Sequence, residues 1–145
     1  MMIPNVDEIL AGFLKASCNG RQLATSRRYQ HVDAQLRKYL EAAGHRFLND
    51  DKVELLGLEQ AYQLDGACSR IMDAEDLLYS LPDFLRDPWL MTNNWHRRSQ
   101  IAQTSRLAQW LCSQRLVDSA LAGCAMIETR LAVDYARRGP DPRPS

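Results

Sequence analysis

Residues 5–14 read NVDEILAGFL, and residues 25–44 read TSRRYQHVDAQLRKYLEAAG. In the first stretch, apolar side chains recur three, four, seven and eight residues after Val6, which places them on one face of an α-helix. Asn5, followed three residues later by Glu8, predicts a capping box at its start. The second stretch repeats the pattern, with Tyr29, Val32, Leu36, Tyr39, Leu40 and Ala43 on one side. Both stretches therefore predict amphipathic helices.

Helical signals continue through the middle of the chain. We expect Gly44 to end the second helix in the left-handed conformation that glycine adopts easily. Asp50 and Asp51 predict the start of a third helix, because carboxylates are favourable at a helix N-terminus. Its apolar side is expected to comprise Val53, Leu56, Tyr62 and Leu64, widened by Leu55 and Leu58. The pair at 65–66, Asp-Gly, is either a turn or a weak point inside one helix that extends to Leu81.

The C-terminal part, from Ser99 to about Arg138, contains no proline and also follows a helical pattern. We expect its buried side to consist of Ile101, Leu107, Trp110, Leu111, Val117, Leu121, Cys124, Ile127, Leu131 and Tyr135. Either one helix or two helices that meet near 112–114 would fit. The sequence thus predicts an all-α, single-domain bundle of four to six helices over residues 1–138. The Pro-rich residues 139–145 are expected to be a disordered tail.

The composition is that of an ordinary globular domain, with 145 residues, 46% hydrophobic residues and a formal net charge of zero. The charge is unevenly distributed. Residues 1–49 carry seven Lys/Arg and four Asp/Glu (+3), residues 50–92 carry three and ten (−7), and residues 93–145 carry eight and four (+4). Such a chain is not a general polycation for nucleic acid. The three segments either attract one another weakly across solvated faces or recruit different partners.

Targeting and cofactor signals are few. The first residues lack the basic region of a signal peptide, and no apolar run reaches the length of a membrane span. The four cysteines are far apart and have no histidine at metal-binding spacing, which argues against a zinc site or a disulfide framework. We therefore expect a cytoplasmic protein with reduced, buried cysteines, no membrane association and no cofactor.

Residues 80–95, SLPDFLRDPWLMTNNW, interrupt the helical pattern with Pro82 and Pro88. This connection between helices is rich in large apolar residues, so it either folds back as a lid over the bundle or forms an exposed interface. The candidate contact residues are Phe84, Leu85, Trp89, Leu90 and Trp95. The favoured hypothesis is a small, non-catalytic helical protein that binds a protein partner as a subunit, adaptor or regulatory module, with self-association expected.

Two alternatives remain from the sequence. Residues 107–121 have the outline of a degenerate helix-turn-helix, which would make the chain a DNA-binding regulator. Its phosphate contacts would come from Arg97, Arg98, Arg106 and Arg115. Asp73 and Asp76 lie three residues apart on an acidic helix and could jointly face Mg²⁺ in a hydrolase. The chain has no glycine-rich phosphate loop and no nucleophile motif, so an enzyme is the less favoured class.

Overall fold

A computed structural model describes residues 3–138 of the chain, and every regular element in that range is helical. The elements are α1 (Val6–Cys18), α2 (Leu23–Ala43), the short 3₁₀ helix η1 (Gly44–Phe47), α3 (Asp50–Tyr62), α4 (Ala67–Ile71), α5 (Ala74–Phe84), α6 (Asn94–Ser113) and α7 (Gly123–Arg138). The predicted all-α fold is confirmed. The number of helices exceeds four to six because the 51–81 stretch forms three helices rather than one or two.

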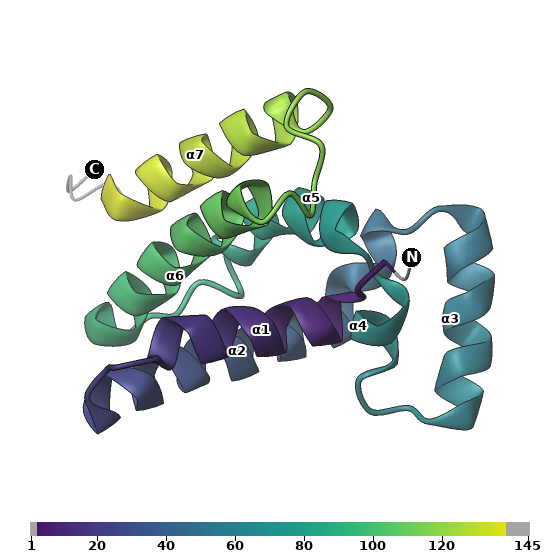
Figure 1. The fold of residues 1–145 in the computed structure, drawn as a ribbon, viewed down its shortest axis with the longest axis horizontal. Coiled ribbons are helices and arrows are strands. Elements are labelled where there is room, and N and C mark those ends of the chain that lie inside the picture. The colour runs from purple at the N-terminus through teal and green to yellow at the C-terminus, as the bar shows by residue number, and fades with distance from the viewer. Residues whose placement is uncertain (1–2, 139–145) are drawn as a thin grey trace, which may run out of the picture.

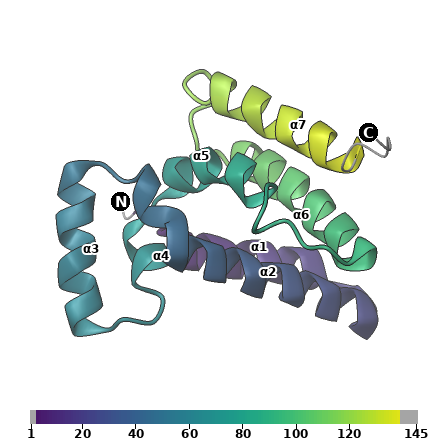
Figure 2. The same cartoon turned by 180° about the vertical axis from the view of Figure 1, so that it is seen from behind.

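The helices form layers (Figure 1). α1 and α2 pack as a pair, α6 packs against α2, and α7 packs against both α5 and α6. Both views place α7 at one edge of the molecule and α3 at another (Figures 1 and 2). Of the helices, α3 packs mainly against the short α4. α3 and α7 are therefore covered on fewer sides than the other helices.

The first helix boundary follows the sequence prediction closely. The Asn5 side chain accepts a hydrogen bond from the Glu8 amide at 2.9 Å, and the Asn5 amide donates to the Glu8 carboxylate at 3.1 Å. This is the expected capping box, which satisfies two backbone donors that a helix start otherwise leaves unpaired. The stripe on α2 is also confirmed, because Val32, Leu36, Tyr39, Leu40 and Ala43 are all buried.

Gly44 is required for a different reason from the one predicted. Its backbone is right-handed, with φ −60° and ψ −28°, so it does not supply a left-handed turn. A β-carbon at this position would lie 2.7 Å from the Cys68 Sγ and 2.9 Å from the Met72 Sδ. Gly44 is therefore needed because α4 passes too close to the end of α2 for any side chain.

The middle of the chain divides at the suspected turn. Gly66 has φ +75° between α3 and α4, so the chain reverses there instead of continuing as one helix. Pro82 was expected to break the helical pattern, yet α5 continues through it to Phe84. Pro82 lies near the C-terminus of α5, where the Leu85 amide donates to the Pro82 carbonyl in a tighter turn at 3.2 Å. The predicted tail, 139–145, lies outside the described residues.

The 99–138 stretch forms two helices, one of the two arrangements that the sequence left open. α6 ends at Ser113, and nine residues, 114–122, separate it from α7. Arg115 has a positive φ of 57°. The amides of Arg115 and Leu116 donate to the carbonyls of Cys112 and Leu111, both at 3.0 Å. This pattern is a Schellman motif with arginine in place of the usual glycine, and it ends α6.

Candidate interaction surfaces

The apolar connection after α5 is fastened to the bundle by one buried amide. Gln100 on α6 is fully buried, and its Nε2 donates to the carbonyls of Phe84 at 3.0 Å and Trp89 at 3.1 Å. Its Oε1 accepts from the Met91 amide at 2.9 Å. Three backbone groups of the connection thus depend on a single side chain. Sequence analysis missed Gln100, because a glutamine on a helix is usually exposed.

Tyr39 on α2 holds the same connection from the other side. Its ring centre lies 5.3 Å from those of Phe84 and Trp89. Its hydroxyl donates to the Ser80 carbonyl at 2.7 Å, so its polar end is satisfied within the core. Burial raises the pKa of the Tyr39 hydroxyl well above its ordinary value, with the Asp83 charge acting in the same direction. The phenol therefore stays protonated and keeps donating.

This geometry corrects the expectation of a continuous exposed patch at 80–95. Phe84 is 0% exposed and Leu85 is 2% exposed, so neither is available to a partner. Trp89 and Leu90 are half-buried and pack against the same core. Trp95 alone is exposed, and the guanidinium carbon of Arg28 lies 5.0 Å from its ring centre. The segment folds back over the bundle, which is the lid arrangement that the sequence left open.

The acidic pair on α5 is engaged with a lysine. Lys52 on α3 donates to Asp73 at 2.9 Å and to Asp76 at 2.6 Å. The two aspartates also cap α5, since each backbone amide donates to the other's carboxylate at 3.0–3.1 Å. Burial acts to raise the pKa of Asp73, but the hydrogen bonds from Asp76 and Lys52 outweigh it and lower that pKa. Within residues 3–138, no three His, Cys, Asp or Glu side chains are grouped closely enough to hold a metal ion.

The helix-turn-helix expectation is wrong. The motif needs a second helix within three or four residues of the first, whereas residues 114–122 contain no helix. Its arginines are dispersed. Arg106 donates to the Tyr29 hydroxyl at 2.8 Å, and Arg115 lies in the connection after α6. Arg97 and Arg98 alone come together, and a groove of about 410 Å³ between α6 and α7 joins them to Arg137.

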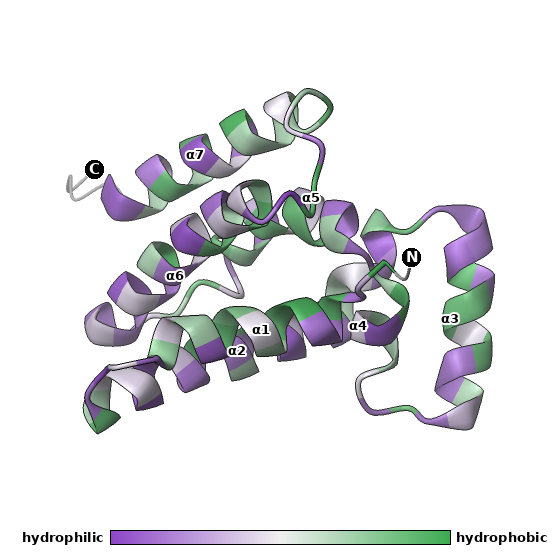
Figure 3. Cartoon of the chain, viewed as in Figure 1, coloured by the Kyte–Doolittle hydropathy of each residue, from purple (hydrophilic) through white to green (hydrophobic). Residues whose placement is uncertain are grey.

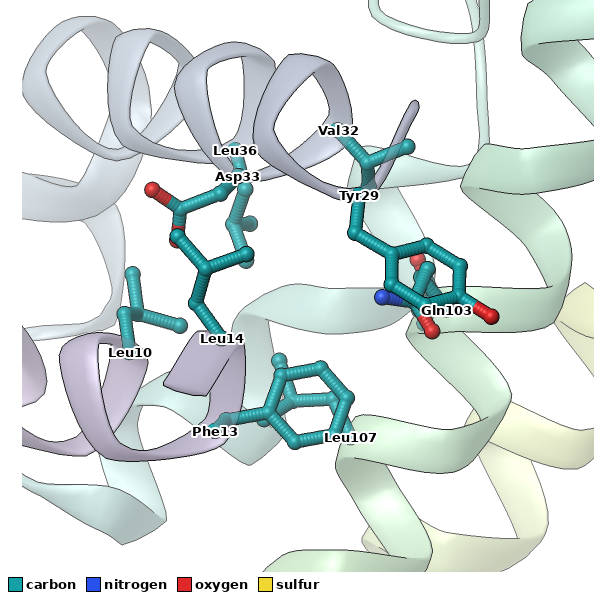
Figure 4. A pocket seen from close by; sticks show the side chains of 10 residues that line it. Leu10, Phe13, Leu14, Tyr29, Val32, Asp33, Leu36, Gln103 and Leu107 are labelled. Carbon is teal, nitrogen blue, oxygen red and sulfur yellow. The ribbon is translucent and has the colours of Figure 1, made fainter. Parts of the chain in front are cut away.

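A more enclosed apolar pocket lies where α1, α2 and α6 meet (Figure 4). Its walls include Leu10, Phe13 and Tyr29, and Gln103 reaches it with an Oε1 that is buried without a hydrogen-bond partner among the described residues. The cavity volume is about 20 Å³. That is enough for about one water molecule, and a substrate would need several hundred Å³. This pocket is therefore part of the core.

The most unusual surface is the outward side of α7, and the sequence assigned it to the core. The described residues place Ala125, Thr129, Ala132, Val133 and Ala136 of α7 against the bundle. The larger apolar residues point away from it, at spacings of three and four. We call them the α7 stripe, which consists of Cys124, Ile127, Leu131 and Tyr135 of the helix together with Leu121 in the connection just before it. The four largest are 60–73% exposed, which reverses the usual order for a helix on a protein surface.

A second apolar surface lies on α3. Leu56 is the only residue of this helix that is buried, although a broad buried side was expected. Leu55, Leu58 and Tyr62 are 51%, 70% and 85% exposed. Asp51 and Glu54 line the same shallow groove as two of these residues, so this surface carries negative charge. Hydrophobic residues are visible on both α3 and α7 in Figure 3.

The charge segments do not neutralise one another through direct contacts. Within residues 3–138, each salt bridge joins residues of the same segment, as Arg37 does with Asp7 and Arg70 does with Glu59. The acidic excess of residues 50–92 therefore remains on the surface, notably on α3.

The chain matches no protein-family model, no curated protein and no solved structure in comparisons with all three. Among the described helices, none combines the length and the apolar character that crossing a membrane requires. Functional evidence therefore comes from the surfaces of the chain itself.

Proposed function

We propose that this protein is a non-catalytic helical module that acts by binding protein, with the α7 stripe as its contact surface. The observation that carries the proposal is the reversal on α7, where alanines face the bundle and Ile127, Leu131 and Tyr135 face outward. Fully burying a side chain of this kind contributes about 1.5–3 kcal/mol, so each contributes roughly 1–2 kcal/mol when a partner covers its exposed part. Contiguous exposed apolar patches typically mark sites of protein association.

The lid arrangement of residues 80–95 supports this assignment indirectly. With Phe84 and Leu85 in the core, the connection offers no large apolar surface besides Trp95. The aromatic and aliphatic anchors that interfaces use are instead on α7, where Tyr135 and Leu131 lie one turn apart.

Photo-crosslinking in the cells that produce the protein tests the proposal. A photoreactive amino acid at Leu131 is expected to form a covalent adduct with a protein, and the same group at Lys38, an exposed position on α2, is not. Mass spectrometry of the adduct identifies the partner. If position 131 yields no more adduct than position 38, the α7 stripe is not a contact surface.

A second candidate function is nucleic-acid binding, supported by the groove between α6 and α7. Arg97, Arg98 and Arg137 line it, and its lining contains no carboxylate. Arg97 donates to the carbonyls of Met91 and Thr92, so the guanidinium groups that suit phosphate oxygens are those of Arg98 and Arg137. Binding of a DNA duplex at low ionic strength, weakened by Arg98→Ala and by added salt, would support this function. Absence of binding at low salt would exclude it.

A further inference from the structure

We infer that the α7 stripe is covered by a second copy of the same chain, with the two α7 helices packed antiparallel and centred on Leu131. The inference rests on the proposed function and names the partner. Most soluble oligomers are symmetric pairs in which the same patch faces itself, so the patch must be self-complementary in both shape and charge. The α7 stripe meets both conditions.

The shape condition follows from residue spacing. In an antiparallel pair centred on Leu131, each residue a given number of positions before Leu131 faces the residue the same number after it on the other copy. Ile127 and Tyr135 each lie four positions from the centre. Each Ile127 thus faces the Tyr135 ring of the other copy, and the two Leu131 side chains meet at the two-fold axis. Large apolar groups are therefore matched over the central part of the stripe, from Ile127 to Tyr135, whereas Cys124 faces Arg138 of the other copy.

The charge condition depends on Arg130 and Asp134. Both line the groove on the α6 side of α7, so they flank the stripe on the same side. Neither forms a salt bridge within residues 3–138. The antiparallel arrangement brings Arg130 of each copy within two residue positions of Asp134 of the other, about 3 Å along the axis. Two reciprocal ion pairs then border the stripe.

The α3 surface does not satisfy the charge condition. Its apolar residues are accompanied by Asp51 and Glu54, so two copies would place like charges together. α7 is 16 residues long, which corresponds to a contact about 24 Å in length. A single pair of helices of this length buries less than the roughly 800 Å² per partner of a standard interface. The dimer is therefore expected to be a weak one.

Sedimentation analysis from about 1 to 100 µM protein tests the inference, since this range spans micromolar affinity. Wild-type protein is expected to pass from the mass of one chain to that of two. Leu131→Glu is expected to stay at the mass of one chain with an unchanged circular dichroism spectrum. Leu58→Glu is the matched control on α3, because it alters a similarly exposed leucine and should dimerise like wild type. Dimer loss in both variants would overturn the inference in favour of an α3–α7 contact.

A charge-swap series tests the orientation. Arg130→Glu and Asp134→Arg are each expected to weaken the dimer by about tenfold, and the double variant R130E/D134R is expected to restore it. A double variant as weak as either single one would overturn the antiparallel pairing. Wild type that remains at the mass of one chain at 100 µM would overturn the whole inference. An adduct between position 131 and a different protein would then still support the proposed function.

Discussion

Replacing Phe84 by alanine discriminates between the two roles considered for residues 80–95. Phe84 is 0% exposed, its ring centre lies 5.3 Å from that of Tyr39, and its carbonyl accepts a hydrogen bond from Gln100. If the segment is a buried lid, the substitution leaves a cavity in the core. If the segment is a contact surface, the substitution removes a partner contact and leaves stability unchanged.

The expected magnitude follows from complete burial. Truncation of a fully buried phenylalanine to alanine costs about 3–5 kcal/mol, which is a large part of the roughly 5–15 kcal/mol that stabilises a typical domain. For a chain of this length, 1 kcal/mol corresponds to about 2–4 °C in Tm, so Phe84→Ala is expected to lower Tm by about 6–20 °C. Most of the effect comes from the lost ring contact with Tyr39 of α2, because the Phe84 carbonyl that accepts from Gln100 is retained in alanine.

Thermal unfolding followed by circular dichroism, on dilute protein, measures this change. Leu131→Ala is the control, because Leu131 is 62% exposed and its truncation should alter the free energy of unfolding by no more than about 0.5 kcal/mol. If Phe84→Ala unfolds within about 2 °C of wild type and instead loses association, the lid assignment is refuted.

Three further predictions follow from local geometry. Arg115→Gly should raise Tm by a few degrees, because a positive φ costs most residues about 1–2 kcal/mol and costs glycine almost nothing. An unchanged or lower Tm in thermal unfolding would contradict the Schellman assignment. Gly44→Ala should destabilise the protein by about 1–3 kcal/mol in urea unfolding, since the alanine β-carbon would meet two sulfur atoms. A variant as stable as wild type would mean that α4 moves aside freely. Alkylation at pH 8 followed by mass spectrometry should label the exposed Cys124 long before Cys68, because burial raises the pKa of the Cys68 thiol to about 12. Equal rates of labelling would show that Cys68 is accessible.

Local signals in the sequence were sufficient to predict the starts of α1 and α3 and the buried face of α2. Asn5 with Glu8, and Asp50 at the start of α3, act within one turn, so no tertiary information is needed to recognise them. The stripe on α2 was predicted correctly because its apolar side chains are buried on one face only. The sequence left open whether a helix ends near 112–114, because the left-handed residue that ends α6 is Arg115 and not glycine.

The candidate sites were harder to predict from the sequence, because the type of a residue does not determine whether its side chain faces the core or the solvent. Phe84 and Leu131 are both large apolar residues. Phe84 is in the core, yet Leu131 is on the surface. Likewise, the carboxylates of Asp73 and Asp76 suggested a cation site, and the cation that they contact is Lys52, 21 positions before Asp73 in sequence.

The sequence by itself determined that this protein is all-helical, where α1 and α3 begin and that its charges are segregated along the chain. These properties arise from interactions between residues a few positions apart. Tertiary structure alone decided which side of α7 faces the bundle. Its alanine side allows close packing against α5 and α6, so Leu131 and its neighbours are left on the outside, and that choice produces the surface on which the proposed function depends.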